Sequence, residues 1–166
     1  GTFRKGKGRG IRKMVISRMK TEDVTDAARI EEKIFSTPWS EQSFLEALEQ
    51  EYTVFFVAKE EEHCVGYIGA YFAADEAEIT NVAVDMEYRR RHIAEALVAE
   101  MQKEAAKRGT HSIFLEVRCS NTGAIALYQK MGFSICGTRR GFYEKPKEDA
   151  YVMVYTPEIS TTMGED

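Results

Sequence analysis

The chain has 166 residues, of which 43% are hydrophobic and 30% charged, which suits one globular domain with its own core and leaves little room for a second. No apolar run approaches the roughly 18 residues that a membrane helix needs, and the first residues lack the pattern of a secretion signal. The three cysteines are widely spaced, which argues against a disulfide framework or a zinc site and favours the reducing cytoplasm.

Basic residues are concentrated at the start of the chain. Six of the 23 lysines and arginines lie within residues 1–13, so the remaining 17 are outnumbered by 27 acidic residues. We predict a disordered basic leader over 1–13, a folded domain over 14–157 and a flexible acidic tail over 158–166; the leader is either a natural extension or an addition from cloning. The acidic body disfavours nucleic acid as a partner and favours a cationic one, although nucleic-acid binding by the leader alone stays open.

Hydrophobic periodicity predicts the elements of the first half of the chain. Alternating apolar residues mark strands, and apolar residues three and four apart mark helices. In chain order the pattern predicts a strand over 15–19, a helix capped by Thr21 that runs to Ile34, a helix over 40–49, and strands over 52–59, 64–72 and 77–84.

The second half opens with an amphipathic helix over 91–108. Its apolar stripe comprises Ile93, Leu97, Val98, Met101 and Ala105. A strand over 112–118, a helix from Asn121 to Gly132, and strands over 133–142 and 149–155 follow. This order predicts an α/β domain with a mixed, mostly antiparallel sheet of about seven strands, flanked by four helices.

A candidate phosphate site lies between the strand over 77–84 and the helix over 91–108. Arg89, Arg90 and Arg91 stand at the start of that helix. A helix start presents unpaired N–H groups and the positive end of the helix dipole, and arginine adds forked donors. The combination suits a pyrophosphate, but a solvated arginine run before an ordinary helix explains the charge pattern equally well.

The stretch VDMEYRRRHIA over 84–94 resembles the coenzyme A loop of the GNAT superfamily of acetyl-CoA-dependent acetyltransferases, which reads Q/R-x-x-G-x-G/A. The resemblance implies that main-chain groups of Val82, Ala83 and Val84 pair with the pantetheine and acetyl carbonyl. It further implies that the coenzyme A pyrophosphate is held by the amides of Arg90, Arg91, His92, Ile93, Ala94 and Glu95. His92 replaces the usual glycine, so its side chain should either crowd the backbone approach to phosphate or add an imidazole donor.

A second segment narrows the resemblance. The string LEVRCSNTGAIALYQKMGF over 115–133 is similar to the bacterial ribosomal-protein alanine N-acetyltransferases, the RimI family. TPWSE over 37–41, RRGFY over 139–143 and EDA over 148–150 extend the similarity to about residues 14–156. This implies direct transfer of acetyl from acetyl-CoA to the α-amine of an N-terminal alanine on a small-subunit ribosomal protein. Another amine as acceptor (a different protein terminus, a lysine or a polyamine) and a non-catalytic acyl-CoA-binding module stay open.

Such a transfer needs a proton acceptor and a proton donor. An amino-terminal ammonium has a pKa of about 8, so a base must take its proton at neutral pH. The resemblance assigns the base to Glu116 and the donor to the leaving thiolate to Tyr128. Period-two alternation puts Glu116 on one strand face with Phe114 and Arg118, where partial burial would raise its pKa. From the pattern alone, a solvated glutamate and a core tyrosine are the simpler interpretations.

The remaining candidates lie near the acceptor and the cofactor. Asn121 is predicted to cap a helix, and the resemblance adds a contact to coenzyme A. Trp39 and Tyr143 are expected to flank the acceptor entrance, with Trp39 as a plug at the core edge being an equal alternative. The three histidines lack the spacing of metal ligands, so we expect no metal, and no G-x-S-x-G turn marks a hydrolase.

Overall fold

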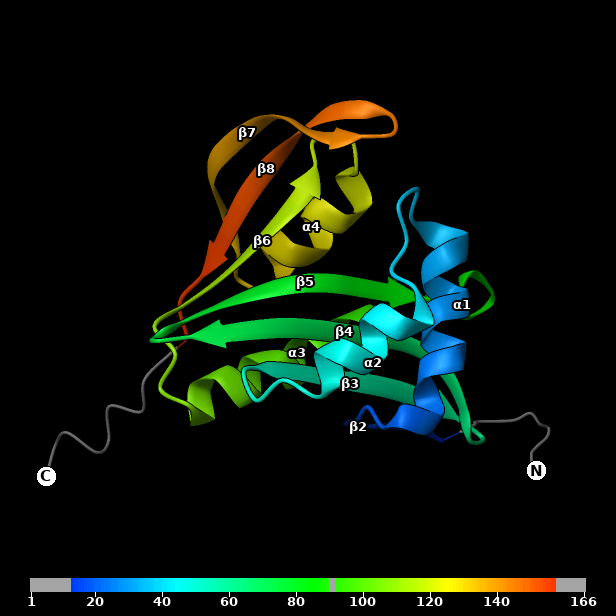
Figure 1. The fold of residues 1–166 in the computed structure, drawn as a ribbon. Helices are drawn as coiled ribbons and strands as arrows, with labels where there is room; N and C mark the ends of the chain where they lie inside the picture. The colour runs from blue at the N-terminus through cyan, green and yellow to red at the C-terminus, as the bar shows by residue number, and fades with distance from the viewer. Residues whose placement is uncertain (1–12, 90–91, 158–166) are drawn as a thin grey trace, which may run out of the picture.

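The computed structural model describes residues 13–89 and 92–157 (Figure 1). The tail expected over 158–166 lies outside these residues, as do Arg90, Arg91 and all of the expected leader except Lys13.

The described residues form seven strands, four α-helices and two short 3-10 turns. In chain order these are β2 (Met14–Arg18), η1 (Thr21–Asp23), α1 (Val24–Ile34), α2 (Glu41–Leu48), β3 (Thr53–Glu60), β4 (His63–Ala73), β5 (Glu76–Val84), η2 (Met86–Tyr88), α3 (Ile93–Lys107), β6 (Ser112–Arg118), α4 (Thr122–Lys130), β7 (Ser134–Glu144) and β8 (Lys147–Tyr155). Every predicted helix and strand is confirmed, with ends that differ by a few residues.

The predicted cap at Thr21 is wrong. Thr21 begins the turn η1, and α1 starts only at Val24. The Asp23 carboxylate accepts a hydrogen bond of 2.8 Å from the Lys20 amide. It also forms an ion pair of 2.8 Å with Lys59. A threonine followed by acids therefore marked a tight turn before the helix rather than the helix cap itself.

The sheet has the strand order β2-β3-β4-β5-β6-β8-β7. All neighbours are antiparallel except β5 and β6, which are parallel and pair only at Glu76–Glu78 with Ser112–Phe114. Beyond these pairs the two strands diverge, as Figure 1 shows. The mostly antiparallel sheet is confirmed, and it opens between its fourth and fifth strands.

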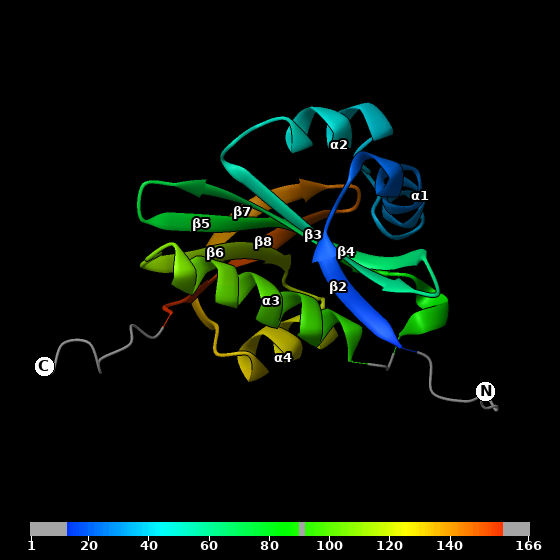
Figure 2. The same cartoon turned by 90° about the horizontal axis from the view of Figure 1, so that it is seen from below.

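Helices cover both faces of the sheet (Figure 2): α1 and α2 lie on one face, and α3 and α4 on the other. The predicted stripe of α3 is confirmed, because Ile93, Leu97, Val98, Met101 and Ala105 are all buried in the core on its side. The second core centres on Phe44, Phe55 and Tyr67 under α1 and α2.

A β-bulge at Thr80 changes which side chains of β5 face each core. Gly69 of β4 pairs with Asn81, whereas the next residue, Ala70, pairs with Ile79, which leaves Thr80 as the extra residue. Ile79 lies in the core beneath α3, but Asn81 faces the opposite core. One inserted residue exchanges the two faces of a strand, so the second half of β5 has the opposite phase from the first.

Edge strand β7 contains a larger irregularity. Arg139 pairs with Ala150 and Tyr143 with Glu148, so β7 has two more residues than β8 between these pairs. Gly141 within the bulge has φ of +61°, and its amide donates to the Asp149 carboxylate at 2.8 Å. Glycine adopts this conformation without steric cost.

Candidate active site

Glu116 lies on β6 with its side chain 14% exposed. Its neighbours Leu115 and Val117 are buried beneath α3 and α4, so Glu116 points to the opposite face, as the alternation predicts. Burial raises the pKa of the Glu116 carboxyl, the neighbouring Glu78 raises it further, and Arg139 opposes the shift. The Arg139 Nε lies 3.5 Å from Glu116 Oε2.

Tyr128 lies on α4 and is 9% exposed. Its ring packs against Phe133 with centroids 5.8 Å apart, as expected of a core tyrosine. Burial raises the pKa of the Tyr128 hydroxyl to about 12, and Tyr143 adds to the shift. The hydroxyl therefore holds its proton at neutral pH, as a proton donor must.

Tyr143 of β7 links these two residues. Burial and the nearby Glu116 charge raise its pKa to about 12, and its hydroxyl also influences Tyr128. The Arg118 guanidinium lies over its ring, 4.3 Å from the centroid. Tyr143 therefore interacts electrostatically with both Glu116 and Tyr128.

The sequence interpretation missed how the turn between β7 and β8 is fixed. Arg118 donates to the carbonyls of Pro146 at 2.8 Å and Lys145 at 3.1 Å, and it pairs with Glu148 at 3.2 Å. The other Glu148 oxygen accepts from the Ser120 amide at 2.7 Å. The EDA string over 148–150 was the available signal, but only the fold shows that it anchors the turn to the end of β6.

The start of α3 carries the candidate pyrophosphate amides. His92, its N-cap residue, has φ 60° and ψ 24°, a left-handed conformation that favours glycine. The His92 side chain is 77% exposed, and its Nδ1 lies 3.2 Å from Glu95 Oε2. The first hydrogen bond of the helix runs from the Ala96 amide to the His92 carbonyl, at 3.1 Å. The amides of Ile93, Ala94 and Glu95 precede it, at the helix start, where amides have no acceptor within the helix.

The cap at Asn121 is confirmed, because its side-chain oxygen accepts from the Ala124 amide at 3.1 Å. Glu95 joins the two helices on this face through an ion pair with Lys130 of 2.9 Å. Val82, Ala83 and Val84 form the end of β5 and pair with β4, on the stretch that has lost its pairing with β6.

Trp39 is half-buried and packs on the core. Its ring lies 5.2 Å from Phe44 and 5.9 Å from Phe55 between centroids, which agrees with the plug at the core edge. Its amide donates to Glu31 Oε2 at 3.1 Å.

Glu31 is a buried carboxylate that the sequence interpretation also missed. It is 3% exposed and accepts hydrogen bonds from the Tyr67 hydroxyl and, at 3.4 Å, from Asn81 Nδ2. Together with the bond from Trp39, these contacts join α1, the loop before α2, β4 and β5. The available signal was its place on the apolar stripe of α1, seven residues after Val24.

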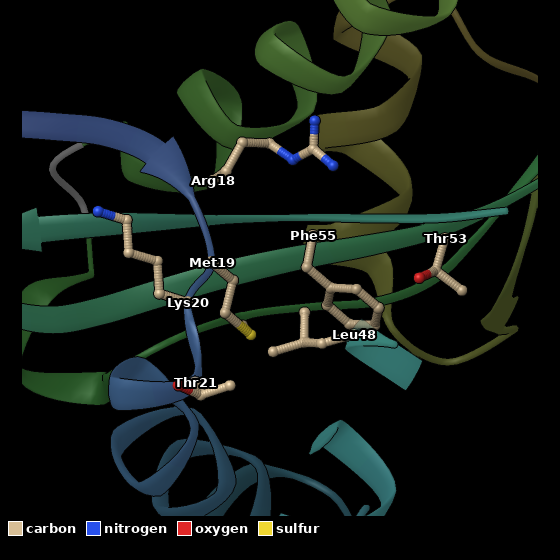
Figure 3. Close-up of a pocket in the computed structure, with 7 residues that line it drawn as sticks. All are labelled: Arg18, Met19, Lys20, Thr21, Leu48, Thr53 and Phe55. Carbon is tan, nitrogen blue, oxygen red and sulfur yellow. The ribbon is translucent and has the colours of Figure 1, made fainter. Parts of the chain in front are cut away.

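A cavity of about 280 Å³ lies away from these residues. Its lining, drawn in Figure 3, comprises Arg18, Met19, Lys20, Thr21, Leu48, Thr53 and Phe55. It includes none of the predicted site residues. Within the described ranges there is no cluster of side chains able to hold a metal ion, and no helix there is long and apolar enough to cross a membrane.

The chain is similar to a known protein family over most of its length. The model of the acetyltransferase (GNAT) family matches residues 24–133. The ribosomal protein bS18-alanine N-acetyltransferase of Escherichia coli K12 is 36% identical over 144 residues, which cover 83% of this chain and 94% of the relative. The N-alpha-acetyltransferase RimI of Mycobacterium tuberculosis is 30% identical over 146 residues, which cover 84% of this chain and 90% of the relative.

A solved structure shares the fold along almost its whole length. The crystal structure of the ribosomal-protein-S18-alanine N-acetyltransferase from Escherichia coli matches with a TM-score of 0.82 and 33% identity, over 93% of this chain and 98% of that chain. The GNAT fold expected from the sequence is confirmed.

Proposed function

The chain belongs to the acetyltransferase (GNAT) family, and on that premise we propose that it moves acetyl from acetyl-CoA directly to the α-amine of an N-terminal alanine. By their names, the Escherichia coli relatives act on ribosomal protein bS18, and we extend that acceptor, and with it a cytoplasmic location, to this chain. The observation that carries the proposal is the placement of Glu116, with its raised pKa, beside Tyr143 where β5 and β6 part.

Two features of the chain fit acetyl-CoA. The α3 amides of Ile93, Ala94 and Glu95 offer donors at a helix start, which suits the pyrophosphate; Arg90, Arg91 and His92 complete this loop in the proposal. The Val82–Val84 stretch of β5 lies where pairing with β6 has ended, so part of its main chain is available to the pantetheine amides. Asn121, at the start of α4, is proposed to contact coenzyme A as well.

The proton transfers follow from the protonation states of two residues. Acetyl-CoA supplies the thioester whose carbonyl carbon accepts the amine. Glu116 takes a proton from the acceptor ammonium, and the new N–C bond forms as the C–S bond breaks. Tyr128, neutral because its pKa is raised to about 12, gives its phenolic proton to the departing thiolate. The nitrogen loses its second proton as the amide forms, and that proton passes through solvent to the Tyr128 phenolate. Solvent takes the proton from Glu116, so one proton is released in each turnover.

The acceptor side is proposed to lie between Trp39 and Tyr143. Tyr143 is held in place by Arg118 at 4.3 Å, and Trp39 is held through its amide by Glu31 at 3.1 Å. The excess of acidic over basic residues beyond residue 13 favours a cationic acceptor segment, as the amino terminus of a basic ribosomal protein would provide.

The test is a transfer assay with acetyl-CoA and a panel of short peptides. Thiol release gives the rate, and mass spectrometry locates the acetyl group. We expect a bS18-like peptide that begins with alanine to gain one acetyl on its α-amine, and Glu116→Gln to lose a factor of about 10² to 10⁴ in rate. The matched control is Glu87→Gln, an exposed glutamate of η2.

Each alternative has its own result. Acetylation of lysine or a polyamine alone would keep the enzyme class and overturn the acceptor. Tight binding of acetyl-CoA without transfer to any amine in the panel would instead favour a non-catalytic acyl-CoA-binding module.

A further inference from the structure

Two glutamates lie on one face of the sheet where β5 and β6 part. Glu78 of β5 pairs with Phe114 of β6 in the last register pair before the strands diverge. Glu116 follows Phe114 by two residues and therefore shares its face of β6. Ala77 and Ile79 of β5, like Leu115 and Val117 of β6, face the core beneath α3, so Glu78 and Glu116 are diagonal neighbours on the opposite face of the sheet.

The two carboxyl groups differ in their access to solvent. Glu78 is exposed, whereas the Glu116 side chain is 14% exposed. Charged and titratable side chains face Glu116 from β5 (Glu78) and from β7, where Arg139 lies 3.5 Å away and Tyr143 is near. Tyr71 of β4, also exposed, lies opposite Glu78.

The Glu78 charge disfavours ionisation of Glu116 and so raises its pKa, because like charges repel. Arg139 is 58% exposed, so it offsets this repulsion only in part, in agreement with the raised pKa of Glu116.

We propose that Glu78 is a positioning residue for the base: it shares a proton with Glu116 and relays to solvent the proton that Glu116 removes from the acceptor. This rests on the proposed role of Glu116. The N–H bond of the ammonium breaks as an O–H bond forms on Glu116. That O–H bond then breaks as one forms on Glu78, and the exposed Glu78 releases the proton to water.

The first test measures proton binding without turnover. The Glu116 carboxyl carbon, labelled with ¹³C, is titrated by NMR in the wild type, Glu78→Gln and Glu76→Gln. Glu76 is the matched control because it is an exposed glutamate two residues away on the same strand. Removing the Glu78 charge should lower the pKa of Glu116 by about one unit, and Glu76→Gln should leave it unchanged. Equal pKa values in all three proteins would overturn the pairing.

The second test uses the pH dependence of kcat/KM with the acceptor that the wild type acetylates. A lower pKa keeps Glu116 ionised to lower pH, so Glu78→Gln should move the acidic limb of the profile to lower pH. It should also lower kcat/KM on the plateau roughly tenfold, because Glu116 becomes a weaker base. In a Glu116→Gln background, Glu78→Gln should cause no further loss. The relay would be overturned if the acidic limb of Glu78→Gln stayed at the wild-type pH. It would also be overturned if the loss in the double variant equalled the product of the two single losses.

These tests separate the two claims. If an amine other than an N-terminal alanine is acetylated, the acceptor claim fails while the pH profiles still decide the role of Glu78. If no amine reacts, the enzymatic proposal and the relay fall together, and the NMR titration still decides whether the two carboxyl groups share a proton.

Discussion

Replacing Glu31 by glutamine should loosen the loop before α2 and weaken acceptor binding. One carboxylate oxygen accepts from the Tyr67 hydroxyl and from Asn81 at 3.4 Å, and the other accepts from the Trp39 amide at 3.1 Å. A glutamine oxygen can serve only one of these sides, and its NH₂ group then faces a donor on the other side: either the Trp39 amide, or Asn81 Nδ2 beside a Tyr67 hydroxyl that can turn to accept. The better-bonded side is that of Tyr67 and Asn81, so the bond to Trp39 should be lost.

The magnitude follows from burial. Glu31 is 3% exposed, so one unpaired donor next to it costs about 1–3 kcal/mol of unfolding free energy. Urea denaturation should show this loss with an unchanged m-value. If Trp39 frames the acceptor, the KM for the peptide should rise several-fold while the KM for acetyl-CoA stays the same.

The control is Glu32→Gln, an exposed glutamate on the same helix. It should change neither stability nor either KM. A Glu31→Gln protein with wild-type stability would refute the hydrogen-bond argument, and an equal rise in both KM values would refute the link to the acceptor.

Three further predictions concern single residues. His92→Gly should raise the unfolding free energy by about 1 kcal/mol in urea denaturation, because φ of 60° suits glycine; no gain would mean that the left-handed conformation is unstrained. Gly69→Ala should lower it by about 3 kcal/mol, since a new Cβ would lie 2.2 Å from the Phe55 ring, whereas Gly137→Ala meets nothing within 4 Å and should be close to neutral. Because the pKa of Glu116 is raised on folding, the unfolding free energy should fall as pH rises from the ordinary glutamate pKa through the folded value. Urea denaturation at several pH values should show this fall in the wild type and not in Glu116→Gln. An identical pH profile in the two proteins would contradict the prediction.

Local sequence patterns predicted the helices and strands because each element buries one face. The apolar residues therefore recur with the period of a helix or of a strand. The stripe from Ile93 to Ala105 and the alternation around Glu116 both follow from this, as does the cap at Asn121. The catalytic roles of Glu116 and Tyr128 came instead from the resemblance to a family, and they stay predictions.

Features that depend on contacts between residues far apart in the sequence could not be predicted from local patterns. The bulge at Thr80 exists only through the register of β4 with β5, and no local period marks it. The Glu31 contacts join residues 36 and 50 positions apart. At His92 the sequence showed an unusual residue, but the left-handed φ that explains the usual glycine required the structure.

The bulge in β7 has a consequence for solubility. β7 is the outer strand at one end of the sheet, and a straight outer strand offers a row of main-chain groups on which another chain can assemble. Two extra residues between Arg139 and Tyr143 interrupt that row, and the exposed Arg139 and Arg140 place like charges beside it. A strand of a second copy of the chain would meet the bend of the bulge, and its own arginines would be repelled by Arg139 and Arg140. This end of the sheet is therefore protected against edge-to-edge aggregation.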